Sequence, residues 1–430
     1  MPIRLDQRDA GFEQAFAALL TTKREVSEDV DRVAADIIAD VRARGDEAVI
    51  ACTSRFDKLD LTPSTLRVSE AEIDAAVAAC SADLLAALET ARGRIEAFHL
   101  RLKPQDSWAR DALGVESGWR WSAIETVGLY VPGGTASYPS SVLMNAVPAR
   151  VAGVERIVMV APTPRGETNP LVLAAARLAG VHEVYRIGGA QAVAALAYGT
   201  ASIAPVAKIV GPGNAYVAAA KRRVFGQVGI DMIAGPSEVL VIADSSANPD
   251  WVAADLLAQA EHDESAQSIL LTNDAALASG VEKALIAQLA VLPRAAIAGK
   301  SWQDFGAILL VEDLERALPL VDRLAPEHLE IVTADPDSLA RKVRNAGAIF
   351  LGGHTPEAIG DYVGGPNHVL PTARSARFSS GLGVADFMKR TSLLKCGVDG
   401  LRALAPAATQ LAEAEGLQAH GRSVTIRLNL

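Results

Sequence analysis

Gln259 and His262 are the residues of this chain whose types and spacing most clearly suggest metal chemistry. They lie three positions apart in a segment, 251–264, whose apolar positions recur at helical spacing, so both side chains would share one face of a helix. A tetrahedral zinc site needs further nitrogen or carboxylate ligands, and Asp361 and His420 are available downstream. A glutamine oxygen is an unusual zinc donor, however. The alternative interpretation is a helix that carries a surface His and Gln.

A second motif, Glu327-His328, directly precedes an expected strand at 329–332. Histidine titrates near neutral pH and can take a proton from a hydroxyl, while a neighbouring carboxylate can orient or deprotonate water. As a dipeptide the motif is weak, because a solvated His at the start of a strand is the simpler interpretation. Asp361 and His368 lie in a stretch rich in Gly and Pro, which indicates a functional loop.

Three glycine-rich turns each follow an expected strand and precede an expected helix. Backbone amides at such turns can face a phosphate, and ligands bind at the carboxyl ends of parallel strands, so the turns indicate a nucleotide site at one sheet edge. Glycine also simply permits tight turns, and none of the three fits Gly-x-Gly-x-x-Gly, so NAD does not follow from them alone. The turns are at 127–135, 187–191 and 210–214.

The elements that must position these groups indicate an α/β protein. Residues 1–119 alternate charged and apolar positions at helical spacing, which predicts a mostly helical N-terminal region. From Thr126 onward, short β-branched runs alternate with glycine turns and Ala-rich helices, the pattern of parallel sheets. Nine strands are expected, at 126–131, 156–161, 184–187, 208–210, 239–243, 268–271, 307–311, 329–332 and 348–351.

Nine strands exceed what one mononucleotide-binding half needs, so two Rossmann-like parallel-sheet units are favoured. We expect an NAD-binding unit at 120–237 and a catalytic, metal-binding unit at 238–384, which meet near Ser237. The remaining residues, 385–430, again show a helical pattern, which predicts a helical C-terminal arm. This arm is expected to pack on the body or on a second subunit.

Composition narrows the possible classes of function. The chain has 430 residues, of which 50% are hydrophobic and 21% charged, as in globular proteins with more than one core. A net charge of −10 without a basic block argues against nucleic acid as a partner. Three scattered cysteines without Cys-x-x-Cys spacing argue against a disulfide framework and favour a reducing cytoplasm. Neither a signal peptide nor an apolar stretch of membrane-spanning length is expected.

The motifs, taken together, resemble those of the histidinol dehydrogenase family over nearly the whole chain. This resemblance implies the oxidation of L-histidinol to L-histidinaldehyde and then to L-histidine, with two NAD⁺ reduced and one zinc per site. The segments that carry it are 128–134, 211–214, 231–238, 259–262, 325–328, 360–362 and 367–371.

The resemblance also implies a role for each matched residue. His328 is expected to be the general base, and Glu327 to activate the water that hydrates the aldehyde. The implied zinc ligands, which also contact substrate, are Gln259, His262, Asp361 and His420. Further substrate contacts are implied for His328, Ser237, His368 and Glu415. NAD contacts are implied for Tyr130, Gln191 and Asn214, one in each glycine turn.

The family is homodimeric with shared active sites, so Glu415 and His420 are expected to complete the pocket of the other subunit. A zinc-dependent NAD dehydrogenase of another small polar alcohol or a sulfonated diol is the nearest alternative. A zinc hydrolase would work without NAD, and a non-catalytic protein would only bind nucleotide or metal. Neither of these explains the glycine turns and the Glu-His pair together.

Overall fold

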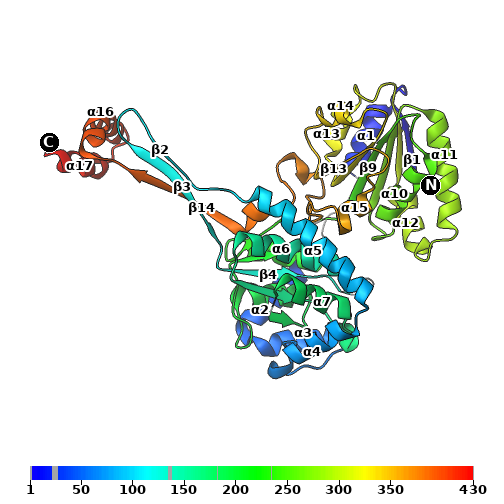
Figure 1. Cartoon of the computed structure of the whole chain (residues 1–430), viewed down its shortest axis with the longest axis horizontal. Helices are drawn as coiled ribbons and strands as arrows, with labels where there is room; N and C mark the ends of the chain where they lie inside the picture. The colour runs from blue at the N-terminus through cyan, green and yellow to red at the C-terminus, as the bar shows by residue number, and fades with distance from the viewer. Residues whose placement is uncertain (1, 22–27, 134–137, 182, 234, 430) are drawn as a thin grey trace.

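The computed structural model describes residues 2–21, 28–133, 138–181, 183–233 and 235–429. Gly134 and Ala234, which belong to two of the matched motifs, lie outside the described residues. Figure 1 shows two α/β units side by side, with a long arm that leaves the body between them and carries the C-terminus at its far end.

The first unit contains a five-stranded sheet in which every neighbouring pair is parallel. Parallel strands are buried on both faces and therefore read as nearly continuous apolar runs, which is why the sequence predicts them well. The strand order is β6-β5-β4-β7-β8, where β4 is Thr126–Tyr130, β5 Arg156–Val160, β6 Glu183–Tyr185, β7 Lys208–Val210 and β8 Gly229–Ile230.

The second unit contains a six-stranded parallel sheet with the order β1-β11-β10-β9-β12-β13. Each of the nine expected strands is present, and its bounds lie within two residues of the prediction. The predicted α/β class with two parallel-sheet units is thereby confirmed. The strands are β1 Ile3–Asp6, β9 Glu238–Ala243, β10 Gln267–Thr272, β11 Ala307–Leu310, β12 His328–Val332 and β13 Ala348–Leu351.

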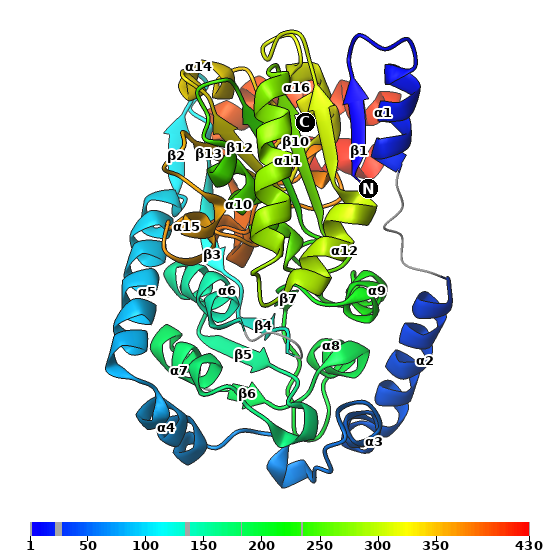
Figure 2. The ribbon, with the colours of Figure 1, turned by 90° about the vertical axis from the view of Figure 1, so that its right-hand side faces the viewer.

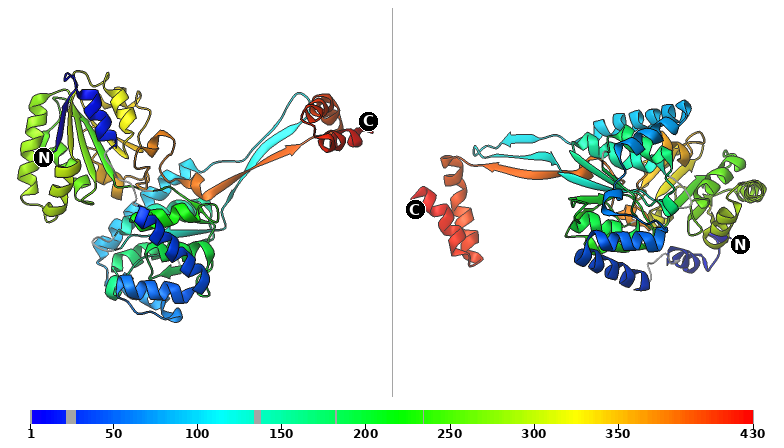
Figure 3. Two further views of the ribbon diagram at one scale, coloured as in Figure 1. Left: turned by 180° about the vertical axis from the view of Figure 1, so that it is seen from behind. Right: turned by 90° about the horizontal axis from the view of Figure 1, so that it is seen from below.

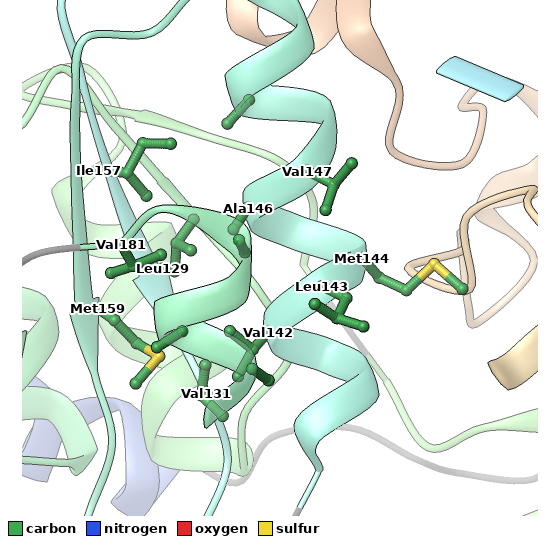
Figure 4. Close-up of a cluster of buried hydrophobic side chains, with 14 of the residues drawn as sticks. Leu129, Val131, Val142, Leu143, Met144, Ala146, Val147, Ile157, Met159 and Val181 are labelled. Carbon is green, nitrogen blue, oxygen red and sulfur yellow. The ribbon is translucent and has the colours of Figure 1, made fainter. Parts of the chain in front are cut away.

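Helices cover both faces of each sheet, and the buried side chains between helices and strands form the cores. Figure 4 shows part of one core of the first unit, where side chains of α6 meet those of β4 and β5. The first sheet lies between α4 Glu70–Ala79, α5 Ala82–Leu102, α6 Pro139–Ala152 and α7 Pro170–Ala179 on one face and α2 Glu28–Arg44, α3 Asp46–Asp57, α8 Gly189–Tyr198 and α9 Ala215–Val224 on the other. The second lies between α10 Pro249–Ala260, α11 Ala275–Leu289 and α12 Ala295–Phe305 and, opposite, α1 Phe12–Thr21, α13 Leu318–Leu324 and α14 Pro336–Ala340. Short 3₁₀ turns occupy Pro63–Thr65, Pro164–Gly166, Ser375–Arg377, Val384–Phe387 and Ile426–Leu428.

The N-terminal region is mostly helical, but it does not form a unit of its own. Residues 3–6 form β1, which pairs in parallel with β11 of the second sheet, and α1 packs on that sheet. Helices α2 to α5 instead cover the first sheet (Figure 2). A four-residue edge strand is too short for its periodicity to distinguish it from a helix end, so the sequence does not reveal it.

The arm is a three-stranded antiparallel sheet capped by two helices, and it extends well away from both units (Figure 3). The prediction of purely helical texture from residue 385 onward is wrong for β14, which pairs with β3 over eight residue positions. Most residues of β14 are exposed, so no alternation of buried and exposed positions marks it in the sequence. The arm comprises β2 Ser107–Arg110, β3 Glu116–Ala123, β14 Met388–Lys395, α16 Val398–Ala414 and α17 Gln418–Thr425.

Gly211, at the third glycine turn, should not tolerate a side chain. Its φ is +106°, and an added Cβ would lie 2.1 Å from the backbone oxygen of Tyr130. Gly226 is the matched control, because its φ is +103° but nothing lies within 4 Å of an added Cβ. Gly226→Ala should therefore cost only the backbone strain, about 1–3 kcal/mol of unfolding free energy. Gly211→Ala should cost clearly more in urea unfolding, and equal costs would contradict the close packing of this turn.

Candidate active site

A cavity of about 600 Å³ lies where the two units meet, since residues of both units line it. It brings together groups from the carboxyl ends of β4 and β7, the linker 231–237, the end of α10, the start of β12, and the region of α15 Glu357–Tyr362. Nine of the twelve residues that the sequence predicts for the site line it: Tyr130, Asn214, Ser237, Gln259, His262, Glu327, His328, Asp361 and His368.

Gln259 lies at the end of α10 and is completely buried. The expectation that His262 shares this helix is wrong, because α10 ends at Ala260 and His262 lies in the following turn. Asp263 and Glu264 make a longer helix unfavourable, since negative charges oppose the helix dipole at its C-terminus. The His262 N–H nevertheless donates to the Gln259 carbonyl at 3.2 Å, which keeps the two residues close.

His328 begins β12 and is buried, with only 4% of its surface exposed, so the interpretation as a solvated histidine is wrong. Its Nδ1 lies 3.0 Å from the Glu238 carbonyl oxygen. A carbonyl oxygen can only accept, so this bond places the proton on Nδ1 and leaves Nε2 free to act as a base. Burial lowers the pKa of His328 to about 4, so the ring is neutral at pH 7.

Glu327 is held by the same residue of the neighbouring strand. Its Oε2 accepts the Glu238 N–H at 3.0 Å, so the backbone of Glu238 contacts both members of the Glu-His pair. Glu327 is 5% exposed and lines the cavity. The pair is therefore positioned by β9, beside which His328 begins β12 and Glu327 lies in the bend just before it.

Asp361 lies on α15, and the buried carboxyl group of Glu330 holds the first residue of this helix. Glu330, two residues after His328, accepts the backbone N–H of Glu357 at 2.7 Å. The carbonyl of Asp361 lies 3.0 Å from His368 Nδ1, and its Oδ1 lies 3.8 Å from His328 Nε2. Asp361, His328 and His368 thus form one cluster.

The ligand atoms of His262, Glu357 and Asp361 all lie within 4.8 Å of one another. Among the described residues, neither polar side-chain atom of the buried Gln259 has a hydrogen-bond partner. An amide buried in this way needs a further partner, and a cation beside His262 and Asp361 would supply one, so these residues fit a zinc ion. Glu357 escaped sequence reasoning, although its spacing of four residues before Asp361 on a helix could have indicated it.

The three predicted NAD contacts lie at the three glycine turns. The Tyr130 hydroxyl accepts the Gly189 N–H at 2.9 Å, and burial raises the pKa of Tyr130 to about 12. Asn214 caps α9 and lines the cavity. Gln191 is buried in the first turn of α8 and does not line the cavity.

Glu415 and His420 lie apart from the other predicted site residues. Both line a separate hollow between α16 and α17, at the far end of the arm (Figure 1). Within one chain the structure therefore does not bring them to the cavity. Any role in this site requires the arm of a second copy of the chain.

The fold and the site together define the class of this protein. Two parallel-sheet units with glycine turns, a buried neutral histidine and a zinc-type ligand cluster at their junction are features of a metal- and nucleotide-dependent dehydrogenase. A profile of the family described as histidinol dehydrogenase matches residues 20–428. The chain belongs to the histidinol dehydrogenase family.

Similar proteins cover the chain from end to end. It is 70% identical over 430 residues to the histidinol dehydrogenase of Bradyrhizobium diazoefficiens, covering 100% of both chains. It is 68% identical over 429 residues to that of Rhodopseudomonas palustris, again covering 100% of both. The crystal structure of histidinol dehydrogenase from Elizabethkingia anophelis superposes with a TM-score of 0.95 at 37% identity, covering 100% of this chain and 98% of the other.

Asp255 on α10 should make the unfolding free energy depend on pH in a way that can be tested. Burial raises its pKa to about 6, and it shares a hydrogen bond with the carboxyl group of Glu330. Because the folded-state pKa lies above the unfolded value, the stabilisation is complete below the unfolded pKa and is lost as the pH rises through about 6. Asp255→Asn should thus raise the unfolding free energy at pH 8, by about 1 kcal/mol after allowance for solvent.

Chemical unfolding at pH 5, 6, 7 and 8, without added metal, measures this effect. The exposed Asp250 in the first turn of α10 is the matched control, and Asp250→Asn should not remove the loss of stability that Asp255 causes as the pH rises through about 6. An Asp255→Asn protein with the wild-type slope would show that this carboxyl ionises normally.

Proposed function

We propose that this chain oxidises L-histidinol in two NAD⁺-dependent steps, through L-histidinaldehyde, to L-histidine. One observation carries the proposal: Glu327 and a neutral His328 face the Gln259, His262 and Asp361 cluster in the same cavity as Tyr130 and Asn214. Base, ligand cluster and coenzyme turns are thereby within reach of one small substrate. Membership of the histidinol dehydrogenase family supports L-histidinol over a sulfonated diol or another polar alcohol.

The two units divide the work between coenzyme and substrate. The unit at 120–237 would bind NAD⁺ through Tyr130, Gln191 and Asn214, and the unit at 238–384 would hold zinc and carry out the catalysis. Zinc would be held by Gln259, His262, Asp361 and, from a second subunit, His420. A bound zinc ion attracts nitrogen donors and so orients the imidazole and amino groups of the substrate. Ser237, His368 and Glu415 would complete the substrate contacts.

In the first step His328 acts as general base. Its Nε2 carries no proton, because Nδ1 donates to Glu238, so it can accept the hydroxyl proton of L-histidinol. At the same time a hydride leaves the carbinol carbon for NAD⁺, and the alcohol becomes an aldehyde. The low pKa of His328 keeps it in the basic form at neutral pH.

In the second step the aldehyde must first gain water. Glu327 is positioned beside His328 and lines the cavity, so it can take a proton from water as the oxygen attacks the aldehyde carbon. His328 returns the proton from the first step to the aldehyde oxygen, so the hydrate forms and the imidazole is neutral again. The hydrate then loses its hydroxyl proton to His328 and a hydride to a second NAD⁺, which yields the carboxylic acid. No thiol intermediate is needed, and the exposed Cys396 lies in the arm, just after β14.

Two identical chains would share each site in this proposal. Glu415 and His420 would reach the cavity of the other subunit, and the length of the arm in Figure 1 supports such an exchange. A zinc hydrolase or a purely binding protein is not favoured, since neither uses the coenzyme turns and the Glu-His pair together. In the described part of the chain, no helix is long and apolar enough to span a bilayer. We place the enzyme in the cytoplasm, because all three cysteines are free.

Changing each member of the Glu-His pair should separate the two steps. Glu327→Gln should slow the oxidation of added L-histidinaldehyde by about 10²–10⁴-fold while it slows the oxidation of L-histidinol less. His328→Asn should slow both steps by a similar factor, because the base serves each. Single-turnover measurements of NADH formation from each substrate give these rates. Equal losses in both steps for Glu327→Gln would contradict its assignment to water activation.

Complementation between two inactive variants tests the shared site. His328→Ala and His420→Ala homodimers should both be inactive. In a mixed dimer with exchanged arms, one of the two sites receives an intact body and an intact arm. About half of the dimers that form from co-expressed chains are mixed, so about a quarter of wild-type activity should return. If the arm instead folds back onto its own body, every site in the mixture carries one defect, and no activity returns.

A further inference from the structure

Lys221 on α9 and Asp231, which follows β8, form an ion pair in the interior of the first unit. Their side chains are only 3% and 1% exposed, and Lys221 Nζ is hydrogen-bonded to Asp231 Oδ1. A buried ion pair rarely adds stability, because removing both charges from water costs as much as their attraction returns. An apolar pair of similar size often holds a fold equally well. The position of the pair therefore requires another explanation.

Both members bind the backbone of a single residue, Gly211. Asp231 Oδ2 accepts the Gly211 N–H at 2.7 Å, and Lys221 Nζ donates to the Gly211 carbonyl at 2.9 Å. Gly211 begins the third glycine turn and packs so closely on Tyr130 that a Cβ could not fit. The ion pair thus fixes the turn that runs from Gly211 to Asn214, on the wall of the cavity.

Asp231 is also the first residue of the linker 231–237 between the two sheets. Its Oδ1 accepts the Met232 N–H at 2.7 Å, so the same carboxylate holds the start of the linker. The linker leads directly to Glu238, whose backbone contacts Glu327 and His328. The pair thereby connects the coenzyme turn to the segment that leads to the catalytic pair.

We propose that Lys221 and Asp231 are positioning residues for the coenzyme: they hold the Gly211–Asn214 turn in the conformation that binds NAD⁺. This inference rests on the proposed function, in which that turn contacts the dinucleotide. Neither residue touches the reacting atoms. Their loss should weaken coenzyme binding while substrate and metal binding persist.

The test is the double change Lys221→Met with Asp231→Leu, which replaces the ion pair by apolar side chains of similar length. No charge is left buried without a partner, but the backbone of Gly211 loses two hydrogen bonds, so the thermal unfolding midpoint should fall while the protein stays folded at the assay temperature. The Kd for NADH, from fluorescence, and the KM for NAD⁺ should each rise at least about tenfold, since small displacements of a binding turn have large effects. The KM for L-histidinol and the zinc content should stay unchanged.

Arg223→Gln is the matched control, since Arg223 lies on the same helix but forms an exposed ion pair with Asp31. Its coenzyme affinity should equal that of the wild type. If the double variant does not fold, Lys221→Met with Asp231→Asn, which leaves no charge buried and keeps a polar group beside the Gly211 N–H, is measured in the same way. A folded variant that binds NADH like the wild type would overturn the inference. A wild type that binds NADH but fails to oxidise L-histidinol would instead overturn the proposed function.

Discussion

The site depends on the parallel pairing of β9 with β12, and above all on the backbone of Glu238. The N–H of this residue binds Glu327, and its carbonyl binds His328. The two side chains could be oriented independently on a loop, but here one residue of a buried strand orients both. Rigid elements hold catalytic groups more accurately than loops do. The first residue of β9 is also where the chain enters the second unit from the linker, so the geometry of the catalytic pair and the junction of the units are set at one point.

A second constraint is the concentration of acidic groups beside this strand pair. Asp255, Glu330 and Glu357 lie in an interior that raises the pKa of each carboxyl group. Such groups are costly unless they share protons, accept backbone hydrogen bonds or meet a cation. Glu330 accepts a hydrogen bond from the start of α15 and shares one with Asp255, while Glu357 belongs to the cluster that suits zinc. The acidic interior thus helps to place Asp361 and makes the site receptive to a metal ion.

Much of this arrangement could be predicted from the sequence, because buried parallel strands and glycine turns leave strong local signals. Strands such as β9 read as nearly unbroken apolar runs. The twelve site residues were implied by the family resemblance, and nine of them line one cavity. The edge strand β1 and the arm strand β14 gave no such signal, since most of their residues are exposed or only half-buried and their partners are distant in sequence.

Residues that act only through tertiary contacts were also invisible in the sequence. Glu357 is marked only by its spacing before Asp361, Lys221 carries no local motif, and the matched segment that begins at Asp231 does not reveal the ion pair, because the pair forms only in the folded unit. For Glu415 and His420, the sequence indicates a role in the site that the structure of one chain does not show. The family resemblance implies them, whereas one chain alone keeps them far from the cavity.

The most direct test of the account is the stoichiometry of the reaction. Purified protein would be incubated with L-histidinol and NAD⁺, and NADH and L-histidine would be quantified before and after treatment with a chelator and re-addition of zinc. Two NADH should form for each L-histidine, and the activity should be lost on chelation and restored by zinc. A zinc-replete protein that forms no NADH from L-histidinol would contradict it.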